Sequence, residues 1–206
     1  MTTDAVQPLC ERPRLSLLKN FLSDEECDHL IERARPKIEP STTVDPDTGE
    51  HIQVEARSST STYFTLGETP LISAIEERIA ALLEVDVVNG EGLQVLRYGV
   101  GQEYQPHFDF FDPNLKGTPM VIATGGQRLA TCIMYLSAVE SGGETRFPEV
   151  DIQVAPNKGD AILFYNLLPD GEVDRQSLHA SLPVLAGEKW VATKWVRERP
   201  YLSNPD

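Results

Sequence analysis

The sequence predicts a mainly β fold, in which two antiparallel sheets pack as a jelly roll and helices from the N-terminal part flank one sheet. Three observations lead to this prediction. The second half of the 206-residue chain holds several short β-prone runs between turns rich in Gly, Pro and Asp. The first half holds two helix patterns. The chain is 40% hydrophobic, enough to fill one core, so we expect one compact unit.

The two helices are predicted from their N-terminal caps. Residues 23–26 read Ser-Asp-Glu-Glu, which is a capping box, and the apolar residues after it recur at helical spacing. They predict a helix over 24–35. Thr69-Pro70 is a cap followed by a first-turn proline, and the apolar pattern behind it predicts a second helix that ends near Leu83.

The segment between the two helices, 40–55, is rich in Pro, Thr, Asp and Gly. This composition disfavours regular structure and predicts a mobile loop. Because the segment is long, it is also a candidate lid over a binding site.

The second half of the chain changes to a strand pattern. β-prone runs occupy 93–98, 129–136, 161–164 and 190–196. The chain is therefore expected to have an N-terminal helical support region over 1–90, a β core over 91–198 and a tail over 199–206, all within one structural unit.

Charge and cysteine content exclude several classes of partner. A formal net charge of −14 argues against a surface that binds nucleic acid, because such surfaces rely on Lys and Arg. No apolar run approaches the ~18 residues of a membrane helix, and the N-terminus lacks the basic and apolar regions of a signal peptide. Cys10, Cys27 and Cys132 are odd in number and far apart, which favours free thiols. We expect a cytoplasmic protein with no nucleic-acid or membrane partner.

A metal site is predicted from His107, Asp109 and His179. In an extended segment His107 and Asp109 point to the same face, because strand side chains repeat every two residues. Two imidazoles and one carboxylate form the facial triad of non-haem Fe(II) oxygenases, which leaves other coordination positions open. The two remaining histidines, His29 in the first helix and His51 in the acidic loop, are interpreted as a helix-surface residue and a solvated loop residue.

The residues before His107 are expected to form a turn. Gly101 to Pro106 contains turn-forming residues, and Pro106 biases Gln105 toward an extended conformation. We therefore expect His107 to begin a strand.

A basic residue near the triad is the candidate anchor for an anionic co-substrate, and Lys189, Lys194 and Arg197 compete for this role. In the strand predicted over 189–195, residues 189, 191, 193 and 195 share one face. If Lys189 faces inward, Lys194 lies outside. A buried cation needs a counter-charge, and a bound dicarboxylate supplies one. An ordinary solvated turn lysine is the alternative interpretation of Lys189.

Several short motifs of the second half occur together and in a characteristic order. These motifs resemble the catalytic domain of prolyl 4-hydroxylases over most of residues 91–198. They are Tyr98 with Gly101-Gln102, Tyr104-x-x-His107-x-Asp109, Gly125-Gly126-Gln127-Arg128, Met134-Tyr135-Leu136, Gly142-Gly143-Glu144-Thr145-x-Phe147-Pro148, Leu178-His179 and Gly187-Glu188-Lys189-Trp190. Tyr165 stands where this family more often has tryptophan.

The resemblance implies a double-stranded β-helix that uses Fe(II), 2-oxoglutarate and O₂. By this similarity His107, Asp109 and His179 are the iron ligands, and Lys189 binds the distal carboxylate of 2-oxoglutarate. Two further hydroxyl groups, those of Tyr98 and Thr145, match positions that assist at this carboxylate. Ascorbate is a candidate reductant.

The resemblance also implies residues that contact a substrate. Arg57 and Ser59 match an Arg-x-Ser element before the core, and Tyr104 and Trp195 match aromatic positions of the substrate cleft. Each has a simpler interpretation: Arg57 as the partner of an acid such as Glu55, Tyr104 as a turn aromatic and Trp195 as core filling.

The predicted activity is hydroxylation of proline in a peptide or protein to 4-hydroxyproline, with succinate and CO₂ as co-products. One alternative is a dioxygenase of the same fold that hydroxylates a free amino acid or small metabolite. A second alternative is a jelly-roll binding module whose histidines are structural. Nucleic-acid demethylation is disfavoured by the acidic charge. Nothing in the sequence indicates the oligomeric state.

Overall fold

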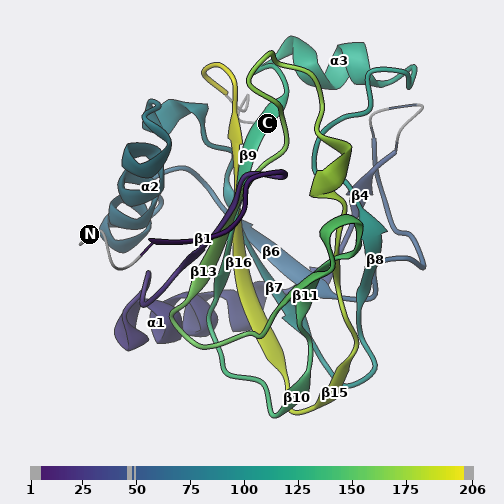
Figure 1. The fold of residues 1–206 in the computed structure, drawn as a ribbon. Coiled ribbons are helices and arrows are strands. Elements are labelled where there is room, and N and C mark those ends of the chain that lie inside the picture. The colour runs from purple at the N-terminus through teal and green to yellow at the C-terminus, as the bar shows by residue number, and fades with distance from the viewer. Residues whose placement is uncertain (1–5, 46–47, 49, 202–206) are drawn as a thin grey trace.

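The computed structural model describes residues 6–45, 48 and 50–201 and is dominated by antiparallel sheets (Figure 1). The largest sheet has eight strands, and its central strands come from the second half of the chain. Its strands, in order across the sheet, are β1 (Val6–Cys10), β2 (Leu15–Leu18), β13 (Ala161–Tyr165), β9 (Arg128–Tyr135), β16 (Lys189–Arg197), β7 (Leu93–Tyr98), β6 (Thr60–Phe64) and β3 (Glu39–Pro40).

A smaller four-stranded sheet completes the predicted jelly roll. Its strands, in order, are β12 (Ile152–Val154), β11 (Thr145–Phe147), β14 (His179–Ser181) and β8 (Tyr104–His107). Two further pairs of strands are β10 (Ser141–Gly142) with β15 (Val184–Ala186), and β4 (Thr43–Val44) with β5 (His51–Ile52). The fold is mainly β with few helices, as the sequence predicted.

Both predicted helices are confirmed. α1 (Asp24–Ala34) begins at Ser23, whose hydroxyl accepts from the backbone N–H of Glu26 while the Glu26 carboxylate accepts from that of Ser23. α2 (Pro70–Leu83) is capped by Thr69. A third helix, α3 (Thr118–Ala123), lies at one end of the sheets (Figure 1). Short 3₁₀ turns are η2 (Arg35–Lys37), η3 (Val87–Asn89), η4 (Pro148–Val150) and η5 (Arg175–Ser177).

The large sheet separates two hydrophobic cores. Side chains alternate along each strand, so one face of β7 and β16 presents Val95 and Ala192 to α1 and α2, and the other presents Leu96 and Val191 to the smaller sheet. The two helices lie together on one side of the large sheet in Figure 1. The second core, between the two sheets, is the one that adjoins the predicted metal site.

The N-terminal 90 residues contribute more than the helices predicted for them. Strands β1, β2, β3 and β6 all belong to the large sheet. Residues 60–64 read Thr-Ser-Thr-Tyr-Phe, a β-prone run that the sequence analysis did not use. Pro8 interrupts the pattern of β1, which lies at the sheet edge, where proline is tolerated.

The sequence analysis predicted no regular structure over 40–55. This prediction is wrong for strands β4 and β5, which pair in a short antiparallel ladder. Asp45 helps to close this ladder, since its carboxylate accepts from the backbone N–H of Thr48 at 2.7 Å. Residues 46, 47 and 49 lie outside the described residues.

The prediction of a turn before His107 is wrong for Tyr104 to Pro106, because Tyr104 to His107 form β8, whereas Gly101, with a φ of 78°, does lie in a turn. His107 therefore ends a strand instead of beginning one. The ladder between β8 and β14 finishes at the pair His107 and His179, so Asp109 lies in a bend beyond the strand.

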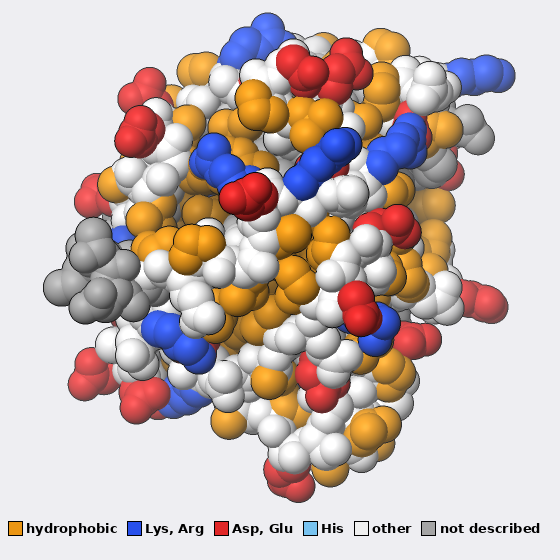
Figure 2. Space-filling model, in the orientation of Figure 1, with side chains coloured by type: hydrophobic (Ala, Val, Ile, Leu, Met, Phe, Trp, Pro, Cys, Tyr) orange, Lys and Arg blue, Asp and Glu red, His pale blue; other side chains and the backbone are white. Residues whose placement is uncertain are grey.

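Among the described residues, no helix is long and apolar enough to cross a membrane. On the face shown in Figure 2, Lys and Arg side chains lie beside Asp and Glu side chains, with hydrophobic side chains visible between them.

Candidate active site

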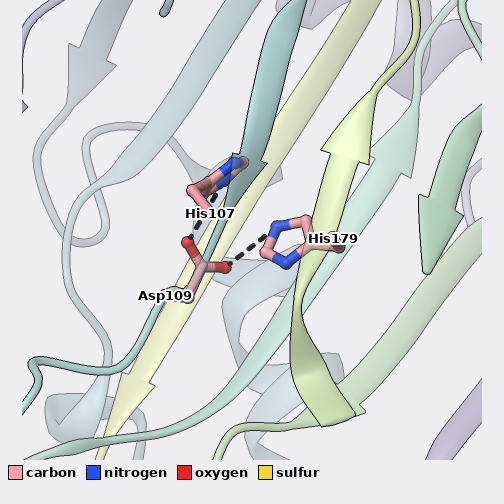
Figure 3. A group of neighbouring side chains, drawn as sticks. All are labelled: His107, Asp109 and His179. Carbon is pink, nitrogen blue, oxygen red and sulfur yellow. Dashed lines mark ion pairs between the residues drawn. The ribbon is translucent and has the colours of Figure 1, made fainter. Parts of the chain in front are cut away.

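Strand pairing brings the three predicted metal ligands together. His107 of β8 and His179 of β14 are direct cross-strand partners, and their rings lie 4.3 Å apart between centroids. The bend after β8 turns the Asp109 carboxylate toward both rings (Figure 3). Its two oxygens lie 3.9 Å from His107 Nε2 and 3.6 Å from His179 Nε2. The three groups offer ligand atoms that all lie within 4.8 Å of one another.

The backbone orients both imidazoles. His107 Nδ1 lies 2.8 Å from the carbonyl oxygen of Gln105, and His179 Nδ1 lies 3.0 Å from that of Ser177. With Nδ1–H donating to a carbonyl, each Nε2 presents its lone pair to the centre. Burial, together with the neighbouring His179, lowers the pKa of His107 to about 3, so His107 is neutral and able to bind a cation.

Asp109 is ionised in this environment. Burial alone would raise the pKa of its carboxyl, but the two imidazoles, Arg128 and a hydrogen bond from Thr131 outweigh that effect and lower it. The Thr131 hydroxyl donates to Asp109 Oδ2 at 2.8 Å. A buried carboxylate and two imidazoles are a donor set suited to a divalent transition-metal ion.

Aromatic rings fix the two histidines in place. Tyr104 stacks on His107 with a centroid separation of 3.5 Å. Phe164 meets His179 edge-on at 4.7 Å, and Phe147 stacks on it at 5.7 Å. These contacts limit water access and ring rotation at the ligands.

A cavity with about 430 Å³ of non-protein volume opens beside the triad. Lys189, Val191, Thr193 and Trp195 of β16 all line it, which confirms the predicted face. Lys189 is 1% exposed, and its ammonium donates to the Ser181 hydroxyl at 2.8 Å. Burial lowers the pKa of Lys189 to about 7, although Glu144 opposes the effect. A carboxylate bound here would supply the missing counter-charge.

The two competing cations lie outside the cavity, Lys194 on the other face of β16 and Arg197 beside α3. Lys194 is outside the cavity as predicted, yet it is not solvated: it is 2% exposed and forms an ion pair with Glu76 of α2 at 2.5 Å. Arg197 is also buried, and its guanidinium donates to the carbonyl oxygens of Val121 and Thr124. Helices α1 and α2 cover the face of the sheet that carries Lys194, which is why this lysine is buried although it lies outside the cavity.

Tyr98 and Thr145 both line the cavity, as the resemblance implied. Tyr98 is the cross-strand partner of Lys189, whose ammonium lies 5.3 Å from the tyrosine ring centre. The Thr145 hydroxyl accepts from that of Tyr135 at 2.9 Å. Burial raises the pKa of Tyr98, so its hydroxyl keeps its proton and can donate to a carboxylate.

A second, larger depression of about 780 Å³ adjoins the cavity, and we call it the groove. The two spaces share four residues: Arg57, Tyr104, Asp109 and Trp195. The remaining wall of the groove comes mainly from loops and α3. Its other lining residues are Thr42, Thr43, Asp45, Tyr63, Phe108, Phe110, Phe111, Asp112, Leu115, Gly117, Thr118, Val121 and Arg128.

Three of the four predicted substrate residues therefore face the groove. Arg57 is 8% exposed and donates to Thr42 O and Gln94 Oε1, so these two groups, and not Glu55, are its hydrogen-bond partners. Ser59 lines neither space in the described part of the chain, because its hydroxyl donates to that of Ser41 at 2.9 Å.

Of the other two histidines, His29 does not belong to the triad. His29 lies in α1, as expected, but it is partly buried, and its Nε2 has no hydrogen-bond partner among the described residues. The side chain of His51 lies outside the described part of the structure.

Comparison with known proteins identifies the family. A model described as the 2OG-Fe(II) oxygenase superfamily matches residues 93–197. Prolyl 4-hydroxylase 5 of Arabidopsis thaliana is 41% identical over 211 residues, covering 92% of this chain and 70% of that protein. Probable prolyl 4-hydroxylase 7 of the same plant is 40% identical over 214 residues, covering 95% and 66%. The chain belongs to the prolyl 4-hydroxylase family of 2OG-Fe(II) oxygenases.

A solved structure agrees with this assignment. The viral collagen prolyl hydroxylase of Paramecium Bursaria Chlorella virus-1, crystallised as a 2OG complex, superposes with a TM-score of 0.72 at 34% identity, covering 92% of this chain and 98% of that one. The chain spans about two thirds of the length of the plant relatives.

The site fits the cofactors of this prolyl 4-hydroxylase family. Its donor set is that of an Fe(II) facial triad, with His107, Asp109 and His179 as ligands. The cavity that holds Lys189 begins at these ligands, so a 2-oxo acid bound at the metal can extend its far carboxylate toward the ammonium. The enzyme uses Fe(II) and 2-oxoglutarate.

Two residues of this site were not assigned from the sequence. Ser181 follows His179 by two positions on β14, and this period-two spacing would have predicted that both face the cavity. Arg128 lies in the groove, where its guanidinium stacks on Trp195 at 3.9 Å and pairs with Glu91 at 2.7 Å. The Gly-Gly-Gln-Arg motif that contains Arg128 was the available signal.

Proposed function

We propose that this enzyme hydroxylates proline within a peptide or protein, forming 4-hydroxyproline with succinate and CO₂ as co-products. The observation that carries the proposal is the continuity of the groove with the cofactor cavity at Asp109. An extended chain lying in the groove would bring one residue to the metal while its neighbours remain on the groove walls. A free amino acid would leave most of these walls uncovered.

The polar groups of the groove suit a peptide backbone. The Nε of Arg57 and the indole Nε1 of Trp195 are buried donors without hydrogen-bond partners among the described residues. Both side chains line the groove and the cavity. Buried donors are costly when unpaired, so carbonyl oxygens of a bound peptide would satisfy them.

The protein's own contribution to the reaction is binding, orientation and exclusion of water. Bound Fe(II) supplies the redox chemistry that couples O₂-dependent decarboxylation of 2-oxoglutarate to hydroxylation of a C–H bond. Lys189 and Ser181, which already form a hydrogen bond, would hold the distal carboxylate, and the Tyr98 hydroxyl would donate to it from the same cavity. Tyr104, stacked on His107, would lie between co-substrate and substrate, since it lines both the cavity and the groove.

The segment 40–55 is proposed to cover the bound peptide. Thr42, Thr43 and Asp45 already line the groove. Proteolysis within this segment should slow when a peptide substrate binds. Cleavage at the same rate with and without peptide would contradict the proposal.

The substrate class is tested with 2-oxoglutarate turnover against a peptide panel, with free proline measured in parallel. Proline-rich peptides should gain the mass of one oxygen atom and stimulate succinate formation, whereas matched peptides with alanine at the target position should do neither. Hydroxylation of free proline but of no peptide would favour the small-metabolite alternative. Absence of succinate from the iron-loaded protein would favour a binding module.

A cytoplasmic location is proposed on the composition and on the three free cysteines, of which Cys27 and Cys132 are buried. Fractionation of the source cells is the direct test, and recovery from an extracytoplasmic fraction would contradict it.

A further inference from the structure

The metal ligand Asp109 stands at the end of a buried chain of hydrogen bonds. Asn166, at the end of β13, donates from Nδ2 to the Thr131 hydroxyl at 2.9 Å. Thr131, on β9, donates to Asp109 Oδ2 at 2.8 Å. Asn166 and Thr131 are fully buried, and Asp109 is 6% exposed. Neither Thr131 nor Asn166 lines the cavity or the groove, so both act from behind the ligand.

The direction of each hydrogen bond follows from the chemistry of its partners. An ionised carboxylate only accepts, so Thr131 uses its single proton for Asp109. The Thr131 oxygen can then only accept from Asn166, which fixes the amide with Nδ2 toward threonine. Because Asn166 occupies the acceptor side of the hydroxyl, the threonine proton stays directed at the carboxylate. The chain of hydrogen bonds thus sets the plane of the Asp109 carboxylate.

The same asparagine also supports the segment that carries His179. Its backbone carbonyl accepts from the N–H of Asp174 at 2.8 Å, and the Asp174 carbonyl accepts from the Ser177 hydroxyl at 2.7 Å. Ser177 O in turn faces His179 Nδ1. Asn166 is therefore linked to Asp109 through its side chain and Thr131. It is linked to His179 through its backbone carbonyl, Asp174 and Ser177.

We propose that Thr131 and Asn166 are positioning residues of the metal centre, which hold Asp109 in the orientation that binds the ion. The proposal rests on the Fe(II) site and not on the identity of the substrate. A carboxylate ligand without this donor would rotate, and groups that orient metal ligands typically contribute a factor of about 10–100 in metal affinity.

One unpaired side-chain atom of Asn166 indicates that this residue does more than stabilise the fold. Its Oδ1 is buried and has no hydrogen-bond partner among the described residues. A buried acceptor without a partner destabilises the fold, so an apolar side chain of similar size would be the more stable choice at this position. The amide donor toward Thr131 is the feature that such a replacement would lose.

The test is calorimetric titration of the metal-free protein with Co(II), without peptide or 2-oxoglutarate. Thr131→Val keeps the side-chain volume and deletes the hydroxyl, and it should weaken Co(II) binding about 10- to 100-fold. Thr131→Ser should restore most of the affinity. Thr60→Val is the matched control, because the Thr60 hydroxyl has no partner among the described residues, and it should bind Co(II) like the parent.

A spectroscopic measurement separates positioning from a general loss of structure. At saturating Co(II), the visible absorption of Thr131→Val should differ from that of the parent, while Thr60→Val should reproduce the parental spectrum. Parental affinity and spectrum in Thr131→Val would overturn the proposal, and so would equal losses in the two valine variants.

Asn166→Leu keeps the proposal testable if Thr131→Val does not fold. This variant should unfold at or above the parental temperature without metal but bind Co(II) more weakly. In a double variant with Thr131→Val, it should cause no further loss, because the amide acts on Asp109 only through the hydroxyl. Unchanged Co(II) affinity in Asn166→Leu would refute the role of the amide. Since no substrate is present, these outcomes do not depend on whether peptidyl proline is hydroxylated.

Discussion

The cofactor cavity and the groove differ in how they are built. Paired strands carry the groups of the cavity: β8 and β14 supply the histidines, and β7 and β16 supply Tyr98 and Lys189. The groove is walled largely by the bend after β8, by α3 and by Thr42, Thr43 and Asp45. Strand ladders hold side chains in a fixed register, whereas connections vary in length and direction. The sheets therefore position the metal ligands and Lys189, whereas connections between strands form most of the proposed substrate site.

The largest effect should come from removing a metal ligand. His179→Ala should lose Fe(II) and nearly all turnover, a loss beyond the roughly 100-fold expected for residues that only support ligands. Bound iron and succinate formation are the measurements. His29→Ala, a histidine remote from the triad, is the control and should keep both. Substantial iron-dependent succinate formation by His179→Ala would contradict the assignment.

The second largest effect distinguishes the two faces of β16, one carrying Lys189 and the other Lys194. Lys189→Met should retain the metal but weaken 2-oxoglutarate binding by about 30-fold or more, because removing one member of a buried charge pair costs roughly 2–5 kcal/mol. Lys194→Met breaks the buried pair with Glu76 on the helix-covered face. It should lower the free energy of unfolding by about 3–5 kcal/mol and leave 2-oxoglutarate affinity unchanged.

The contrast between the two faces of β16 fails if Lys189→Met and Lys194→Met behave alike. Parental 2-oxoglutarate affinity in Lys189→Met would mean that another group binds the distal carboxylate. A large loss of affinity in folded Lys194→Met would mean that the two faces of β16 are coupled.

A third effect follows from the titration of Lys189. Its pKa of about 7 in the cavity means that the ammonium form dominates below pH 7 and the neutral form above it. Binding of a dicarboxylate requires the ammonium, so the Kd of 2-oxoglutarate should be flat below pH 7 and rise by up to about tenfold per pH unit above it. Calorimetry on the Co(II)-loaded protein measures this slope. 2-Oxobutyrate, which lacks the distal carboxylate, is the control and should show no such rise.

The smallest effect should come from the groove. Tyr63 lies on β6, lines the groove and is 47% exposed, so Tyr63→Ala should fold normally. Loss of this aromatic contact should raise the KM for peptide about three- to tenfold, the effect of roughly 1 kcal/mol. The 2-oxoglutarate affinity should not change. A change in 2-oxoglutarate affinity with an unaltered peptide KM would reverse the assignment of the two regions.

The sequence predicted the cavity better than the groove for physical reasons. Period-two alternation along β16 placed Lys189 inside and Lys194 outside without knowledge of the fold. It could not show that Lys194 is buried, because that depends on how α2 covers the sheet. Similarly, His-x-Asp spacing predicted two ligands on one side, but the bend that turns Asp109 inward depends on where the ladder with β14 ends.

The groove and the residues behind the ligands could not be predicted in this way. The groove combines Tyr63, Arg128 and α3, which are distant in sequence and meet only through tertiary packing. Thr131 and Asn166 have no motif of their own, and their contact with Asp109 follows from the pairing of β9 with β13. Residues 40–55 were misread because two-residue strands are too short to produce a periodic pattern.

The most direct test of the account measures succinate and hydroxyproline together in one reaction with Fe(II), 2-oxoglutarate, O₂ and a proline-rich peptide. The account predicts equal amounts of the two products, with the new oxygen on proline in the peptide. It also predicts that Lys189→Met lowers both products in parallel, while Tyr63→Ala shifts only the peptide concentration required. Sustained succinate formation without hydroxyproline in any peptide of the panel would contradict the proposed substrate class.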